Sequence, residues 1–359
     1  MTGFRHIAWT AQGTTPAEIA EALRRLLIEG QMRHAGHAPA RALNLVCVCD
    51  REESDEIAIR LRGAGRYLAS RTIVCAVEPR RDRIDATAEI SSDDTSGPDG
   101  PALLRETVTL ELGEQHLSRL EPIVDPLVVT DLPTVVWSPH DYRDAVQALL
   151  PLAQVVLLDT VEEQDLADGL DHACRLLDSA YVVDLAWLRS TPWRERVAAT
   201  FDPPDLRAEL WTVNAVTVRH HPDSAAAGML LIGWLASRLG WTLGALSRRN
   251  GQLAGASRSG ELEIQVTLEG APQEVRGLSG LTLETASGRR LTLDRGAGGL
   301  RANYRNARGD ERTWTVLGAS RGEGGILGEG IRQALLRDPT YGPAVSAARK
   351  LVAGGAVRA

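Results

Sequence analysis

Two long runs of apolar residues stand out in the first half of the chain. Leu43 to Cys49 and Thr72 to Val77 are almost continuously apolar, which is typical of strands buried on both faces of a sheet. The stretch between them, about Glu52 to Leu68, has helical periodicity, with Ile57, Leu61 and Leu68 on the inner face. Strand, helix and strand in this order predict a parallel βαβ unit.

The rest of this half alternates between helical and strand periodicity. Thr15-Pro16-Ala17-Glu18 is a strong helix start, because Thr15 can cap, Pro16 suits the first turn and Glu18 can close a capping box. We expect that helix to stop at Gly30, with a loop over 31–41. The other predicted elements are strands at Arg83–Ile90, Leu104–Leu112, Thr134–Trp137 and Val155–Asp159, helices at Glu114–Val124, Tyr142–Leu150 and Val161–Leu177, and a mobile acidic loop over 91–101.

After Tyr181 the pattern changes to alternating strands closed by helices. Thr191 and Pro192 predict a helix start, with Trp193, Val197 and Phe201 on one face. The further predicted elements are strands at Trp211–Val218, Glu261–Glu269, Leu281–Glu284, Arg290–Leu293 and Thr313–Leu317, and helices at Ala225–Leu239, Ile326–Leu336 and Pro343–Leu351. Ser287-Gly288 is the expected hairpin turn.

These patterns predict the fold class. The N-terminal half is α/β, layered around a partly parallel sheet, and an α+β C-terminal domain with an antiparallel sheet follows. We expect domains at 1–180, with a subdivision near residue 125, and at 181–359.

Composition narrows the function classes. The formal net charge of −7 argues against nucleic acid as the main partner. The longest apolar run, Ala225 to Ala236, is too short to span a bilayer, so no membrane association is expected. The N-terminus lacks the pattern of a signal peptide and the chain has only 4 cysteines, so we expect a cytoplasmic protein.

Motifs for catalysis, cofactors or metals do not emerge from the sequence. Lys350 is the only lysine, so a Walker A loop is absent, and the histidines follow no metal-binding pattern. Cys47 and Cys49 share a face of one predicted strand, and Cys75 lies in its neighbour. These three cysteines could form a redox switch or a soft metal site, or they could be small core residues.

Five of the eight tryptophans fall between Trp187 and Trp241, and arginines accompany the first two of them. Trp and Arg are the residues that most often carry binding energy at interfaces, but tryptophan also fills cores. Trp234 and Trp241 lie on one helix face and are expected to be structural. Candidate partner-binding residues are Trp187, Arg189, Trp193, Arg194 and Arg196.

The block Asp184-Leu-Ala-Trp-Leu-Arg-Ser-Thr-Pro-Trp-Arg194 resembles the signature of the glucose-6-phosphate dehydrogenase assembly proteins, the OpcA family. Supporting matches are Thr15-Pro-Ala-Glu-Ile19, Asp131-Leu-Pro-Thr-Val-Val-Trp137 and Gly233-Trp-Leu-Ala-Ser-Arg-Leu-Gly240, so the resemblance covers about residues 15–245. The chain departs from the family pattern at Ser138, where a second tryptophan is frequent, and at Leu68-Ala69, where a His-Pro pair is frequent.

The resemblance implies a protein that is not an enzyme and needs no cofactor. It would bind glucose-6-phosphate dehydrogenase, promote its assembly or allosteric activation, and so control NADPH supply in the oxidative pentose phosphate pathway. The alternative is a sugar-phosphate-binding protein or enzyme in which the clustered arginines clamp an anion. A sugar-phosphate effector of docking would combine the two. The redox control known in photosynthetic relatives is not implied, because none of the four cysteines matches theirs.

Overall fold

The computed structural model describes residues 6–33, 41–64, 70–93, 103–163, 165–317, 323–334 and 336–352. The chain forms two compact units, each with its own sheet. The first contains Met1–Leu158, Ser179–Val183 and Glu323–Leu336; the second contains Asp159–Asp178, Asp184–Gly322 and Arg337–Ala359. The two units are described separately below.

The first unit is built on an eight-stranded mixed sheet in the order β1-β4-β5-β3-β2-β6-β7-β8. Parallel pairing joins β5, β3, β2, β6 and β7, whereas β1 and β4 are antiparallel additions at one side. The strands are β1 His6–Ala11, β2 Leu43–Asp50, β3 Ser70–Val77, β4 Asp85–Asp93, β5 Leu103–Leu112, β6 Thr134–Trp137, β7 Val155–Leu158 and β8 Tyr181–Asp184. The predicted βαβ unit and the α/β class are confirmed.

Most helices of this unit begin close to the predicted positions, but α10 begins at Glu323 rather than Ile326. The helices are α1 Pro16–Arg33, α2 Ser54–Ala64, η1 Glu114–Arg119, α3 Leu120–Val124, η2 Asp125–Leu127, α4 Arg143–Leu149 and α10 Glu323–Gln333. The capping box of α1 is confirmed, since the Thr15 N–H donates to Glu18 Oε2 at 2.9 Å and the Glu18 N–H to Thr15 Oγ1 at 3.4 Å. Leu68, predicted on the inner face of α2, lies outside the described residues.

The predicted stop at Gly30 is wrong, because α1 continues to Arg33. A Cβ at Gly30 would meet only Ile7 and Ile90, at 3.9 Å, so this glycine lies on the helix face turned toward β1 and β4. Packing against the sheet therefore outweighs the low helix propensity of glycine. The expected loop over 91–101 begins later, since β4 extends to Asp93, and residues 94–101 lie outside the described part of the chain.

The second unit holds an eight-stranded sheet in the order β10-β11-β12-β9-β13-β14-β15-β16. All pairs are antiparallel except β12 with β9. The strands are β9 Val213–His220, β10 Ser247–Arg249, β11 Gln252–Ser259, β12 Leu262–Gly270, β13 Leu278–Thr285, β14 Arg290–Gly296, β15 Gly299–Arg305 and β16 Glu311–Leu317. The mainly antiparallel second half confirms the α+β prediction.

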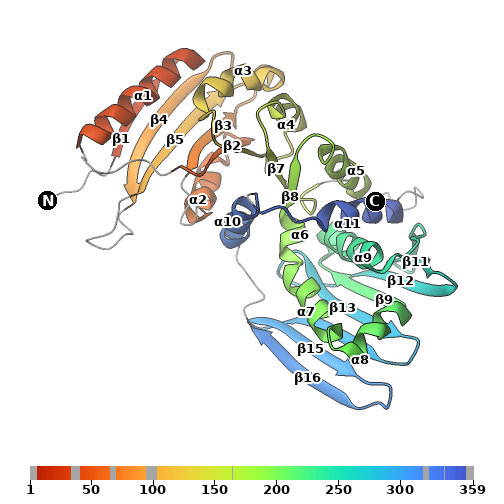
Figure 1. Cartoon of the computed structure of the whole chain (residues 1–359). Coiled ribbons are helices and arrows are strands. Elements are labelled where there is room, and N and C mark those ends of the chain that lie inside the picture. Colours follow the sequence, from red (N-terminus) through yellow and green to blue (C-terminus); the bar gives the residue numbers. More distant parts are fainter. Residues whose placement is uncertain are drawn as a thin grey trace. The chain divides into compact units, whose positions relative to one another are not determined.

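One face of this sheet is covered by α9, which crosses β9 and β12 (Figure 1). The helices of the unit are α5 Leu166–Leu176, α6 Leu185–Arg189, α7 Thr191–Phe201, α8 Pro204–Arg207, η3 Ala208–Thr212, η4 Pro222–Ser224, α9 Ala225–Leu239 and α11 Tyr341–Val352. The C-terminal helix α11 packs closely on α9. A Cβ at Gly233 would lie 2.2 Å from the Ala344 carbonyl oxygen, so only glycine allows this approach.

Three helix starts of this unit differ from the prediction, and one of them is α11, which begins at Tyr341 rather than Pro343. Helix α5 begins at Leu166 rather than Val161, because the Asp165 side chain caps it by accepting from the Asp168 N–H at 2.9 Å. Helix α7 has Ser190, not Thr191, at its N-cap position, and no side-chain cap bond is formed there. Among the described helices, none has the length and apolar character needed to cross a membrane.

Candidate functional site

The signature block starts with a buried aspartate that ties three segments together. Asp184 ends β8 and caps α6, where its Oδ1 accepts from the Ala186 N–H at 2.9 Å and from the Thr160 N–H at 3.2 Å. Its Oδ2 accepts from Thr160 Oγ1 at 2.9 Å and from the Tyr341 hydroxyl at 3.1 Å. Burial and the nearby Asp159 carboxylate raise the pKa of Asp184 to about 7.

Trp187 occupies the centre of the block and is buried, with 2% of its surface exposed. Its indole N–H donates to Asp338 Oδ2 at 2.8 Å, and its ring meets Tyr341 edge-on, with the two centroids 5.7 Å apart. Asp338 shortly precedes α11, and Tyr341 is the first residue of that helix. The signature tryptophan therefore fastens the start of the C-terminal helix within this unit.

Arg194 covers the other side of the Trp187 ring. Its Cζ lies 3.6 Å from the ring centroid, which is a close cation–π stack. The same guanidinium donates to Ser190 Oγ at 3.1 Å, to Thr191 Oγ1 at 3.0 Å and to the Trp187 carbonyl at 3.2 Å. An Asp338 oxygen lies 3.8 Å from it. The Arg194 side chain is 11% exposed, and this burial lowers its pKa to about 10.

The other named residues of the block also point inward, with one exception. Arg189 pairs with Asp159 at 2.7 Å, and the two side chains are 15% and 10% exposed. Trp193 is 1% exposed and lies on the buried face of α7 with Val197 and Phe201, as predicted. Arg196 is half-buried, and its Nε has no hydrogen-bond partner among the described residues. The structure thus joins Trp187, Arg189, Trp193 and Arg194 to the interior, and the Arg196 Nε atom is itself buried.

This arrangement bears on the anion-clamp alternative. A clamp needs guanidinium groups that are free to meet a phosphate. The Arg189 and Arg194 guanidinium groups already face carboxylates of Asp159 and Asp338. Trp241 is 8% exposed and Trp234 is half-buried, but the two do not share a helix face as predicted, because α9 ends at Leu239 and Trp241 follows its Gly240 C-cap.

The three strand cysteines lie in the core of the first unit but not on one face: Cys47 and Cys49 share a face of β2, whereas Cys75 pairs in register with Val48 and lies on the other face of the sheet. Cys47, Cys49 and Cys75 are all fully buried in β2 and β3. Burial raises the pKa of the Cys47 and Cys75 thiols, so the thiolate that redox or metal chemistry requires is disfavoured. Redox activity of this group stays a prediction, and the geometry is that of core packing.

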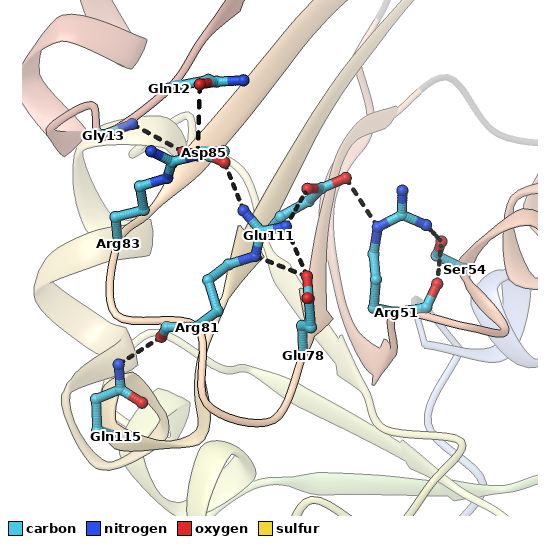
Figure 2. A network of polar contacts seen from close by, with 10 residues as sticks. All are labelled: Gln12, Gly13, Arg51, Ser54, Glu78, Arg81, Arg83, Asp85, Glu111 and Gln115. Atoms are coloured by element: carbon cyan, nitrogen blue, oxygen red, sulfur yellow. Dashed lines mark hydrogen bonds and ion pairs between the residues drawn. The ribbon is translucent and has the colours of Figure 1, made fainter.

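A polar network in the first unit was not foreseen from the sequence (Figure 2). Glu111 near the end of β5 accepts from Arg51 at 2.8 Å and pairs with Arg81 at 2.9 Å. Arg81 also donates to Glu78 at 2.6 and 2.8 Å and pairs with Asp85. Glu78, Arg81 and Asp85 are three or four residues apart, but Arg51 and Glu111 come from distant segments that no local spacing relates to them. Each charge is matched by an opposite one, which is the pattern of a structural network.

A second polar group in this unit has the donors of a metal site. His140 Nε2 lies 2.8 Å from Glu53, and its Nδ1 lies 3.3 Å from Asp50. The Nδ1 atom also accepts from the Asp50 N–H at 2.9 Å. The Nδ1 lone pair of His140 therefore accepts from the backbone, and its Nε2 faces the Glu53 carboxylate. Because both ring nitrogens have partners within the fold, we assign no metal to this group.

Two family models match, and they describe the two domains of a "Glucose-6-phosphate dehydrogenase subunit". The model of its N-terminal domain matches residues 33–175, and the model of its C-terminal domain matches residues 180–345. Together they cover most of the chain and include the whole signature block. Each family model falls mainly on one of the two sheets.

Similar proteins come from cyanobacteria, all named putative OxPP cycle protein OpcA. The proteins of Synechocystis and Synechococcus elongatus are 31% and 29% identical over 38% and 41% of this chain, and that of Nostoc punctiforme is 26% identical over 64%. The matches span 30%, 34% and 48% of those proteins, so the chain aligns with less than half of each relative.

Among solved structures, an apo scyllo-inositol dehydrogenase from Lactobacillus casei aligns with 88% of the chain at 9% identity and a TM-score of 0.47. A likeness this low assigns no function. The two consecutive domain matches identify the family, and the signature residues that suggested it form one connected cluster. The chain belongs to the OpcA family of glucose-6-phosphate dehydrogenase subunits.

Proposed function

We propose that this chain is a non-enzymatic subunit that binds glucose-6-phosphate dehydrogenase in the cytoplasm and promotes its assembly or allosteric activation. NADPH production in the oxidative pentose phosphate pathway would rise as a result. The observation that carries the proposal is the pair of family models, both named for a subunit of that enzyme, over residues 33–175 and 180–345. The names of the cyanobacterial relatives support the same pathway.

The five residues selected from the sequence enter this proposal in two roles. Trp187, Arg189, Trp193 and Arg194 support docking indirectly, because they hold α6, α7 and the start of α11 in one arrangement. Arg196 is the candidate for direct contact, because its side chain is only half-buried; its Nε is buried, so a carboxylate of the partner would be met by the terminal nitrogens of the guanidinium group.

The experiment is a reconstitution with the purified glucose-6-phosphate dehydrogenase of the same organism. Light scattering after gel filtration reports complex formation, and NADPH absorbance reports dehydrogenase activity with and without this chain. We expect a complex and either a higher oligomeric state or a higher turnover of the enzyme. If no complex forms and neither activity nor oligomeric state changes, the proposal is wrong.

A matched pair of variants tests the contact role of Arg196. Arg196→Ala should weaken the complex, whereas Arg238→Ala, an exposed arginine on α9, should leave it unchanged. Equal behaviour of the two variants would remove Arg196 from the contact.

A thermal-shift titration with glucose 6-phosphate addresses the alternative function. The proposal expects no saturable stabilisation of the isolated chain, because Arg189 and Arg194 are already paired. Saturable stabilisation would favour the sugar-phosphate-binding alternative instead.

A further inference from the structure

The outer strands of the second sheet carry an unusual concentration of positive charge. Residues 289–317 contain seven arginines and three carboxylates, in a chain whose net charge is −7. Three of these arginines have partners within the fold: Arg289 pairs with Glu209, Arg290 pairs with Glu284, and Arg295 donates to the Leu278 carbonyl. The remaining four, Arg301, Arg305, Arg308 and Arg312, form what we call the hairpin arginines.

The hairpin arginines lie on β15, β16 and the turn between them, at one edge of the sheet (Figure 1). None of the four is paired with a carboxylate among the described residues. Arg301, Arg308 and Arg312 are exposed, Arg305 is half-buried, and Arg312 lies over the Trp314 ring at 5.6 Å. Positive charge at this edge is therefore not neutralised within the described fold.

The two carboxylates of the hairpin are held by asparagines instead. The Asn306 side-chain amide donates to Asp310 at 2.9 Å, and that of Asn303 donates to Glu311 at 3.3 Å. The Asn306 side-chain oxygen also accepts from the N–H groups of Arg308 and Asp310, at 2.9 and 3.0 Å. The turn that presents Arg308 is therefore fixed by its own hydrogen bonds. The two carboxylates accept from amides rather than from the hairpin arginines, whose guanidinium groups form no ion pair among the described residues.

We infer that three of the hairpin arginines, Arg301, Arg305 and Arg308, are a docking surface for an acidic segment of the partner protein, which under the proposed function is the dehydrogenase. Arg312 pairs in register with Tyr304 and lies on the other face of the hairpin. Guanidinium groups match carboxylates geometrically through paired hydrogen bonds. Complementary charge also speeds and orients association. A nucleic-acid duplex is a poorer match, because a chain of net charge −7 repels a long polyanion while a local acidic segment meets only the hairpin.

The inference is tested with two triple charge reversals on the same sheet. The test variant is Arg301→Glu/Arg305→Glu/Arg308→Glu. The matched control is Arg248→Glu/Arg249→Glu/Arg258→Glu, on β10 and β11 at the opposite edge, where all three residues are exposed. Both variants change the net charge equally, so they separate local from global electrostatics.

The readout is the Kd for the purified dehydrogenase at low and at physiological ionic strength, by biolayer interferometry. We expect the test variant to bind at least about tenfold more weakly and the control to stay within about twofold. The unaltered chain should also lose more affinity with added salt than the test variant. Unchanged binding of the test variant, or equal losses in both variants, would overturn the inference while leaving the proposed function intact.

Other outcomes identify other occupants and equally overturn the inference. If the unaltered chain self-associates in sedimentation and only the test variant is monomeric, the occupant is a second copy. If the unaltered chain shifts the mobility of a DNA duplex in a gel and the test variant does not, the occupant is nucleic acid. If the unaltered chain forms no complex with the dehydrogenase, the proposed function itself fails, which is distinct from losing the complex only in the test variant. A triple Arg→Ala variant replaces the reversal if thermal unfolding shows that the latter is destabilised.

Discussion

Two arginine-bearing regions of the second unit use the same side chain in opposite ways. In the signature cluster, formed by Asp184, Trp187, Arg189, Arg194, Asp338 and Tyr341, the guanidinium groups are largely buried and face rings, carbonyls or carboxylates of the same chain. On the β15–β16 hairpin, the arginines are mostly exposed and have no carboxylate partner among the described residues. The first region keeps its interactions within the fold, and the second leaves them for another molecule.

Whether an arginine-rich segment is structural or binds a partner depends on whether the fold supplies acceptors for its guanidinium groups. Dense tryptophan and arginine are typical of binding hot spots, but they are equally suited to an interior where each N–H finds an acceptor. Burying a guanidinium group is costly unless it is paired, so burial implies that the fold itself supplies the partners. The arginines that can bind a partner protein are those for which the fold itself supplies no acceptor.

The largest expected effect is the loss of stability caused by removing Trp187 from the signature cluster. Trp187→Ala removes a ring that is 2% exposed, together with its bond to Asp338 and the Arg194 stack. We expect a loss of about 3–5 kcal/mol in the free energy of unfolding of the second unit. Urea titration followed by circular dichroism measures it.

The control for that change is Trp211→Ala. Trp211 lies in η3 of the same unit and is 58% exposed, so its removal should cost less than about 1 kcal/mol. Similar losses for both tryptophans would contradict the structural role assigned to the signature.

A smaller, pH-dependent effect is expected at Asp184. Its pKa is raised from 3.8 to about 7 in the fold, so the native state holds a proton that the unfolded state has already released. The stability from this group is complete below pH 3.8 and is lost as pH rises toward 7, by up to roughly 4 kcal/mol. Urea titrations between about pH 4 and about pH 8 should show this decline in the unaltered chain and a flatter curve in Asp184→Asn.

An exposed aspartate supplies the comparison. Asp205→Asn on α8 should keep the pH dependence of the unaltered chain, because Asp205 is exposed. If Asp184→Asn also kept the full decline, Asp184 would not be the group responsible for it.

Local periodicity was sufficient to predict most of the fold. The apolar runs of β2 and β3 and the apolar helix α9 were located within a residue or two, because burial on all sides leaves few polar positions to confuse the pattern. Strand β11 was missed since Gln252–Ser259 has little apolar periodicity and is a strand through its pairing with β12. Tertiary pairing overrides weak local preference there.

The candidate site was predictable in position but not in orientation. The block Asp184–Arg194 was selected for partner contact, which stays a prediction, and its partners within the fold, Asp159, Asp338 and Tyr341, come from segments that no spacing in the sequence relates. The sequence shows that the hairpin contains four arginines, but not that their side chains lack carboxylate partners among the described residues. In this described part of the fold, the Asn303 and Asn306 amides donate hydrogen bonds to Glu311 and Asp310, and these carboxylates form no ion pair with the arginines.

The smallest expected effect sharpens the contrast between the two regions with one conservative substitution. Arg194→Lys keeps the charge but loses the flat stack on Trp187 and the spread of donors to Ser190 and Thr191, so it should cost about 1–2 kcal/mol of unfolding free energy. Arg308→Lys should change stability by less than about 0.5 kcal/mol, because the exposed Arg308 side chain has no partner to lose among the described residues. Urea titration of both variants decides the matter. If both substitutions lowered the free energy of unfolding equally, the partners that the fold supplies would not explain the difference between buried and exposed arginines.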